Sequence, residues 1–358
     1  MTAPWPEAAA ALEVIDGGFA TTIQDAGRPE WTHLGVPVSG AADPWSLAVA
    51  NLLIGNDPGA AALEMALTGP TVLMPGPVTI GLAGADLGAR IEGGRHLAPG
   101  RSHRLSAGEI LTFTGDPTAG PTTGWRGYLA VPGGFDVPIV LGSRSTCLAA
   151  GFGGLDGRPL RGGDVLAVAA GGTGSGGGAG SRGDAASGRA GLVRPELAWP
   201  APDGGGISPG APAPTVLLVL AGPMPGIDAL VGREWRVSSA ADRVGVRLDG
   251  DPLPSGIGGE TTTHGVPWGA IQVPPDGRPI ILGADHQVTG GYRVVGVVIS
   301  ADLPALGQLR PGAPLRLVAT TLAEAHDALR ARAAALAAGA AALREAAGWG
   351  ALIDAAGS

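Results

Sequence analysis

The chain has 358 residues, a formal net charge of -8 at pH 7 and a sequence pI of ≈ 5.2. This length argues for two domains, and the acidic balance excludes binding to nucleic acid through an excess of cations. All 23 basic residues are arginine, which excludes a P-loop lysine, Schiff-base chemistry and a biotin attached to this chain.

The start of the chain shows no targeting signal. Residues 1–7 lack a basic region, so no signal peptide is expected, and no apolar run is long enough to cross a bilayer. The expected location is the cytoplasm, with no membrane partner. The single cysteine, Cys147, can form no internal disulfide and is expected to be a small buried residue.

Residues 11–170 form the first predicted unit, which is rich in β structure. Branched residues bounded by glycine and proline predict strands over residues 72–80 and 110–113. One helix is expected near the start, because Asp43 suits the N-cap and Pro44 suits the first helical position. The 64 glycines and 32 prolines favour short strands and many turns throughout.

A nine-residue phrase occurs three times along the chain. It begins at Leu105, Leu160 and Leu309, and each copy has a turn at glycine followed by an alternating strand. This pattern suits the edge of a barrel or sandwich. Because the last copy closes the second half, the phrase suggests two β units of related design.

The rest of the chain divides into three parts. Residues 171–213 are mostly Gly, Ala, Ser and Pro, which predicts a flexible linker. Residues 214–318 form the second predicted β unit, with strands over residues 216–220 and 280–282. Residues 319–347 are expected to form a terminal helix that packs on the body through a narrow leucine stripe at positions 322, 329, 336 and 343.

Two stretches concentrate polar residues among glycines and prolines, as binding loops do. The first contains Thr21-Thr22-Ile23-Gln24-Asp25-Ala26-Gly27-Arg28 and Gly35-Val36-Pro37-Val38-Ser39-Gly40-Ala41-Ala42-Asp43. The second contains Gly269-Ala270-Ile271-Gln272-Val273-Pro274-Pro275-Asp276-Gly277 and Asp285-His286-Gln287-Val288-Thr289-Gly290-Gly291-Tyr292. With these motifs the chain resembles the allophanate hydrolase subunit 2 proteins, also described as the C subunit of 5-oxoprolinase or the biotin-dependent carboxyltransferase family.

The resemblance implies a fold, an activity and partners. It implies a mainly β fold of cyclophilin-like β-barrel architecture, and a subunit of an ATP-dependent enzyme complex that opens 5-oxoproline to glutamate. It also implies a subunit 1-like companion protein and a third lactam-hydrolase subunit. The related alternative is a carboxyltransferase that acts on urea or a similar amide, with biotin only on a partner protein. A third alternative is a non-catalytic partner of a companion that resembles a kinase inhibitor.

Some positions depart from the family pattern. The family has Ser-Glu where this chain has Thr263-His264, and Arg-Gln-Thr where it has His286-Gln287-Val288. It also has Ser at the position of Ala241 and Met at the position of Val244. These departures bear on the substrate of the chain.

The strongest catalytic candidates are Asp285 and His286. A carboxylate beside an imidazole at a strand end is suited to a general base and its partner. Arg243 is expected to hold a phosphate or carboxylate; the alternative is a salt bridge to Asp242 or Asp285. The histidines show no metal-ligand spacing, so no metal site is expected.

The remaining candidates are polar residues in the same two stretches, and we expect them to bind substrate. They are predicted to face one another across one cleft between the two units. The alternative is that they only satisfy backbone groups in their own turns, and for Asn51 the two interpretations are equally weighted. The substrate-binding candidates are Gln24, Arg28, Ser39, Asn51, Arg243, Gln272, Gln287 and Thr289.

Overall fold

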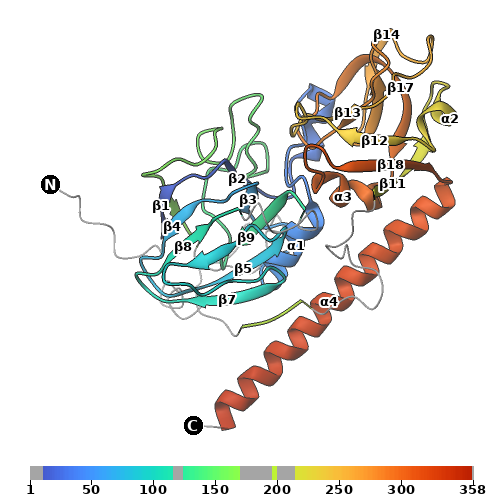
Figure 1. Ribbon diagram of the computed structural model, residues 1–358. Coiled ribbons are helices and arrows are strands. Elements are labelled where there is room, and N and C mark those ends of the chain that lie inside the picture. The colour runs from blue at the N-terminus through green and yellow to red at the C-terminus, as the bar shows by residue number, and fades with distance from the viewer. Residues whose placement is uncertain (1–10, 116–123, 170–195, 200–213, 357–358) are drawn as a thin grey trace.

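The computed structural model of the chain describes residues 11–115, 124–169, 196–199 and 214–356. It is mainly β, with two β units side by side and one long helix that runs past both (Figure 1). The predicted linker, residues 171–213, lies outside the described residues except for 196–199.

The first unit consists of two five-stranded sheets that pack face to face. One has the order β10-β1-β4-β8-β6 and the other β2-β3-β9-β5-β7, and all their pairings are antiparallel. The hydrophobic core between them includes Val72, Leu111 and Leu129. The strands are β1 (Ala11–Asp16), β2 (Ala20–Gln24), β3 (Ala62–Ala66), β4 (Thr71–Leu73), β5 (Val78–Gly84), β6 (Ala89–Ile91), β7 (Arg101–Leu105), β8 (Ile110–Phe113), β9 (Arg126–Ala130) and β10 (Val165–Ala167).

The second unit is a closed barrel of 7 strands, with β14 added outside it on β17. Strand β11 closes the barrel because it pairs with both β18 and β17. Trp235, Ile271 and Leu315 lie in the barrel core. The strands are β11 (Thr215–Ala221), β12 (Glu234–Val237), β13 (Gly245–Asp249), β14 (Glu260–Gly265), β15 (Ala270–Val273), β16 (Ile280–Leu282), β17 (Thr289–Val298) and β18 (Pro314–Ala319).

Helices cover the sheets and join the units. The predicted early helix is present as α1 (Pro44–Leu52), and the Asp43 carboxylate caps it by accepting from the Ser46 N–H at 2.9 Å. No helix among the described residues is both long and apolar enough to cross a bilayer. The other helices are η1 (Pro29–Leu34), α2 (Ile227–Leu230), η2 (Ser300–Asp302), α3 (Leu303–Gly307) and α4 (Leu322–Ala356).

One predicted strand is wrong. Residues 72–80 are not one strand but the end of β4, a turn and the start of β5. Pro75 and Pro77 stand in this interval, and neither can donate a hydrogen bond to a sheet. The strands predicted over 110–113, 216–220 and 280–282 agree with β8, β11 and β16.

The recurring phrase has one structure in all three copies. Its glycines, Gly108, Gly163 and Gly312, adopt φ of 83°, 93° and 79°, a region that suits glycine. The N–H of each donates to a carbonyl of another strand or turn, and β8, β10 and β18 follow. The same turn therefore starts one strand in each of three places, two in the first unit and one in the barrel.

Helix α4 packs on both units through different parts of its length (Figure 1). Near its start Ala325 is buried beside Ile299 of the barrel unit, and further on Leu343 is buried against the first unit. Only half of the predicted leucine stripe packs on the body of the protein, since Leu322 and Leu329 are 60% and 44% exposed. The helix begins with a capping box, in which the Thr321 N–H donates to the Glu324 carboxylate and the Glu324 N–H to the Thr321 hydroxyl.

Candidate active site

A buried ion cluster joins the two units. Arg243, just before β13, hydrogen-bonds both carboxylate oxygens of Asp285, through Nε at 2.8 Å and Nη2 at 3.1 Å. Its Nη1 forms an ion pair with Glu64 of β3 in the first unit, and its Nη2 also donates to the Gly40 carbonyl at 2.6 Å. The side chains of Asp285 and Glu64 are 1% and 4% exposed. Arg243 is therefore a buried bridge between the units.

Glu64 lies on the outer face of its sheet because the strand alternates. Its neighbours Leu63 and Met65 point into the sheet–sheet core, so Glu64 points away from it. There it accepts hydrogen bonds from the Tyr128 hydroxyl at 2.7 Å and the Ala42 N–H at 2.8 Å. The groups that contact this buried carboxylate are donors or cations, as burial of a charge requires.

A second polar contact between the units lies beside the first. Gln308 follows α3 of the second unit, and its Nε2 donates to the Asp43 carboxylate at 2.7 Å. Its Oε1 accepts from the N–H groups of Trp125 and Arg126, each at 2.9 Å. Arg126 in turn donates to the Gly307 carbonyl and lies 3.3 Å from the Glu64 carboxylate. The two contacts fix how the units sit against each other.

The charges in this cluster stabilise one another. Burial alone raises the pKa of Glu64, but the positive charges of Arg243 and Arg126 outweigh it and hold that pKa below its usual range. Burial likewise opposes the charge on Arg243, yet Glu64 and Asp285 raise its pKa above the ordinary value. Both groups are therefore ionised at neutral pH.

The first sequence motif folds into tight turns against this cluster. The Ser39 N–H donates to the Ala284 carbonyl at 3.1 Å, next to Asp285. Gly40 has φ of 80°, and a Cβ there would lie 2.8 Å from the Gly27 nitrogen, so only glycine fits. Residues 24–43 of the first polar stretch and the loop at 284–286, which leads into the second polar stretch, therefore lie side by side.

Arg28 and Gln24 are buried beside this turn. The Arg28 Nη2 donates to the Ser145 carbonyl at 2.5 Å and its Nε to the Val140 carbonyl at 3.3 Å. Gln24 Nε2 donates to the next carbonyl, that of Thr146, at 3.1 Å. The buried atoms Arg28 Nη1, Gln24 Oε1 and Ser39 Oγ have no hydrogen-bond partner among the described residues. Such atoms are costly unless something binds them.

In the second motif His286 has a defined tautomer. Its Nδ1 lies 2.7 Å from the Gln287 carbonyl, which can only accept, so Nδ1 carries the proton and Nε2 carries a lone pair. Burial lowers the pKa of His286 below its ordinary value of 6.5, although the nearby Asp285 charge opposes the change. A neutral imidazole whose second ring nitrogen carries a lone pair is a competent general base.

Four predicted site residues remain: Gln272, Gln287, Thr289 and Asn51. Gln272 is buried in β15 with its Nε2 unpartnered in the part of the chain that the structure describes, whereas Gln287 and Thr289 are exposed. Asn51, on α1, hydrogen-bonds the carbonyls of Leu47 and Ala60 and the side chain of Asn56, which fits the alternative of a residue that stabilises its own turn. A binding role for these four residues stays a prediction.

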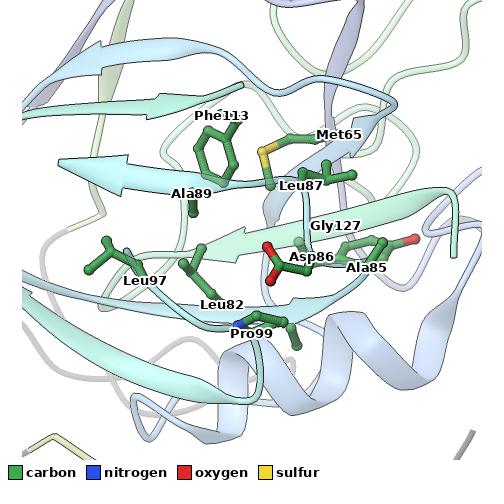
Figure 2. Close-up of a pocket in the computed structure, with 12 residues that line it drawn as sticks. Met65, Leu82, Ala85, Asp86, Leu87, Ala89, Leu97, Pro99, Phe113 and Gly127 are labelled. Atoms are coloured by element: carbon green, nitrogen blue, oxygen red, sulfur yellow. The ribbon is translucent and has the colours of Figure 1, made fainter. Parts of the chain in front are cut away.

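A separate cavity lies inside the first unit, between its two sheets (Figure 2). Its walls are apolar side chains such as Leu82, Leu97 and Phe113, and Asp86 carries the one carboxylate among the residues that line it. A cavity with so few polar groups lacks the donors that the interface offers. We therefore place the candidate active site at the ion cluster rather than here.

Known proteins share the region that contains the ion cluster. Residues 34–319 match the protein family described as carboxyltransferase domain, subdomain A and B. The chain belongs to this family. The chain is 36% identical over 317 residues to the C subunit of 5-oxoprolinase from Escherichia coli (strain K12), and the match covers 88% of this chain and 94% of that protein.

Longer relatives contain the same region as one part. The chain is 31% identical over 359 residues to the urea amidolyase of Lachancea kluyveri, and the match covers 89% of this chain but 18% of that protein. The crystal structure of the Kluyveromyces lactis urea carboxylase superposes with a TM-score of 0.73 at 28% identity, over 93% of this chain and 29% of the other. The helix α4 lies beyond the residues that match the family.

Three residues of the cluster have no site role predicted from the sequence: Glu64, Arg126 and Gln308. Glu64 had a signal, because it is the one charged residue in the otherwise apolar strand Ala62–Ala66. Arg126 and Gln308 had no such signal in the sequence, since a single polar residue is common both at the start of a strand and after a short helix. Of the two alternatives for Arg243, the salt bridge to Asp285 forms and the one to Asp242 does not. The Asp242 carboxylate accepts instead from the N–H groups of Val244 and Gly245.

Proposed function

We propose that this chain is a subunit of an ATP-dependent amidohydrolase complex that opens a small cyclic amide, 5-oxoproline, to glutamate. One observation carries the proposal. The chain matches 94% of the length of a 5-oxoprolinase C subunit, whereas it matches only 18% of a urea amidolyase. A chain that corresponds to a whole subunit is expected to do that subunit's work.

The roles of the site residues follow from their contacts. His286 takes a proton from the attacking water at its free Nε2, and Asp285 stabilises the resulting imidazolium through its negative charge. Arg243 fixes the Asp285 carboxylate through both oxygens. Arg28 supplies a positive charge for an anionic group of the substrate or for the oxyanion that forms on the amide.

ATP is expected to bind on the companion subunits. The N-terminus of α1 is an unsuitable phosphate site, because the Ser46 N–H already donates to the negatively charged Asp43 carboxylate. The chain also lacks the lysine of a P-loop. We therefore propose a subunit 1-like partner and a third, lactam-hydrolase subunit that complete the enzyme.

The experiment is reconstitution. The purified chain is mixed with its subunit 1-like companion and the third subunit, and glutamate and ADP are measured with 5-oxoproline and ATP. We expect little turnover from the chain alone and full turnover from the complex. Asp285→Asn in the complex should lower the rate by about a hundredfold or more. Full turnover by the isolated chain would contradict the proposal, and an unchanged rate would remove Asp285 from the mechanism.

A carboxyltransferase is the second candidate, and the likeness to the Kluyveromyces lactis urea carboxylase favours it. In that case biotin is carried by a partner protein, since this chain has no lysine. Transfer of a carboxyl group from a carboxybiotinylated partner to urea, in place of ring opening, identifies this activity. Binding to the companion with neither reaction identifies a non-catalytic partner.

A further inference from the structure

We propose that Arg28, Ser39 and Gln24 form a subsite for a small ligand that carries a carboxylate next to an N–H group. The likeness to known proteins assigns no role to these three residues. The inference rests on the proposed function, because it takes the carboxylate to be that of the cyclic amide substrate. Hydrogen bonds, burial and charge around the three side chains support it.

The three residues are neighbours in the fold. Gln24 and Arg28 donate to consecutive carbonyls, those of Thr146 and Ser145, so their polar ends are neighbours. The backbone of Ser39 lies beside that of Arg28, because the Arg28 N–H donates to the carbonyl of Val38 at 2.8 Å. Thr22 shares the outer face of the sheet with Gln24 and hydrogen-bonds it at 3.0 Å, whereas Ile23 points into the core.

The charge on Arg28 lacks a carboxylate partner among the described residues. Its two occupied nitrogens donate to backbone carbonyls, and its guanidinium lies 4.9 Å from the centre of the Phe152 ring. Asp25 and Asp285 are the nearby acidic groups. Asp25 is already bound by the Ser143 hydroxyl and the Arg144 N–H, both at 2.6 Å, and Asp285 by Arg243. A buried charge without a counter-ion is costly, so a bound anion would stabilise this guanidinium.

The unpartnered atoms define the chemistry of the ligand. Arg28 Nη1 and the Ser39 hydroxyl are donors, and each suits an oxygen of a carboxylate. Gln24 Oε1 is an acceptor, because Nε2 of the same amide makes both donor contacts, to Thr22 and Thr146, and it suits an N–H group. A cyclic amide with a carboxylate on the carbon beside its nitrogen presents this combination, whereas urea does not.

Access to the subsite passes Phe152. The three unpartnered atoms are closed to solvent, and the half-buried ring of Phe152 covers the guanidinium. The ligand must therefore displace this ring as it enters. Gly153 follows it with φ of 73°, in a turn where a Cβ would meet the Ser145 carbonyl at 2.1 Å, so this turn packs closely on Ser145.

The test is direct binding to the full chain by calorimetry. The probes are 5-oxoproline, 2-pyrrolidinone, which is the same ring without the carboxylate, and inorganic phosphate. We expect 5-oxoproline to bind at least about tenfold more tightly than 2-pyrrolidinone, since a hydrogen bond to a charged group is lost. Equal binding of the two lactams, no detectable binding of 5-oxoproline, or competition by phosphate would each overturn the subsite.

Variants of the chain locate the binding. Arg28→Gln should abolish the preference for 5-oxoproline, while Arg316→Gln, an exposed arginine on the barrel, should keep it. Ser39→Ala should weaken binding without lowering the thermal unfolding midpoint, because its hydroxyl has no partner among the described residues to lose. Unchanged binding in Ser39→Ala and Arg28→Gln contradicts the proposal, and Ser39→Ala decides it alone if Arg28→Gln does not fold.

The binding test and the turnover test can give opposite results, so the subsite and the proposed function are tested independently. Ring opening by the reconstituted complex without carboxylate-dependent binding to this chain would overturn the subsite and leave the proposed function standing. Carboxylate-dependent binding with no ring opening by the complex would support the subsite and contradict the hydrolase.

Discussion

The Arg243 guanidinium of the second unit forms a buried ion pair with the Glu64 carboxylate of the first unit. The same guanidinium hydrogen-bonds both oxygens of Asp285 in its own unit. One side chain thus joins the catalytic candidate to the sheet of the other unit. Any change in how the units are docked is therefore expected to reach the site through Arg243.

The first prediction concerns the strength of this bridge. Glu64→Gln should destabilise the protein by about 3–5 kcal/mol, because it leaves Arg243 and Arg126 buried with less negative charge around them. Denaturant unfolding measures the loss. The double variant Glu64→Gln with Arg243→Met should lose less than the sum of the single variants, because each single variant leaves the other member of this pair buried without its counter-charge and the double variant removes both members. Strict additivity would show that the pair is not coupled.

The second prediction is the pH dependence of stability. The pKa of Glu64 is lowered in the folded protein from an ordinary value of 4.5. The carboxylate therefore contributes stability above that pH, and the contribution is lost as the pH falls through the folded pKa. The free energy of unfolding of the wild type should fall in acid more steeply than that of Glu64→Gln. Parallel curves for the two proteins below pH 4.5 would contradict the assignment.

The buried Asp43 carboxylate changes with pH in the opposite sense. Burial raises its pKa above 3.8, although bonds from Gln308 and Ser46 oppose this. Its ionisation therefore costs stability as the pH rises through the raised pKa. Because Asp43 is present in both proteins, the difference between wild type and Glu64→Gln isolates Glu64.

The third prediction uses two glycines of α4. A Cβ on Gly348 would meet nothing within 4 Å, so Gly348→Ala should stabilise the helix by up to about 1 kcal/mol. A Cβ on Gly339 would lie 2.2 Å from the Trp199 ring, so Gly339→Ala should destabilise the protein instead. Thermal unfolding of the two variants, with the same substitution in one helix, separates packing from helix propensity. Equal stabilisation by both would mean that Trp199 does not pack on α4.

The fourth prediction concerns His286 as the base. His286→Gln should lower turnover of the reconstituted complex by about 10²–10⁴-fold, because the proton acceptor is removed. The wild-type rate should show an acid limb below pH 6.5, where the lowered pKa of the imidazole lies. His326→Gln on the exposed face of α4 is the control and should keep the full rate. An acid limb that persists in residual His286→Gln activity would assign it to another group.

The sequence by itself determined the local elements. Asp43 and Pro44 start α1, Thr321 and Glu324 start α4, and three glycine turns start three strands, because the conformation of a cap or turn depends mainly on the residues within it. It also singled out the two polar stretches, and of the buried atoms without a partner those of Thr21, Gln24, Arg28, Ser39 and Gln272 belong to them.

The tertiary structure decided which of these residues meet. Arg243 and Glu64 are far apart in sequence, and only the docking of the barrel on the first unit brings their charges together. The same docking gives Gln308 its four hydrogen bonds to the first unit, which no local pattern announces. A buried charge is stable only beside its counter-charge, so the partner of such a residue is fixed by the fold and not by its neighbours along the chain.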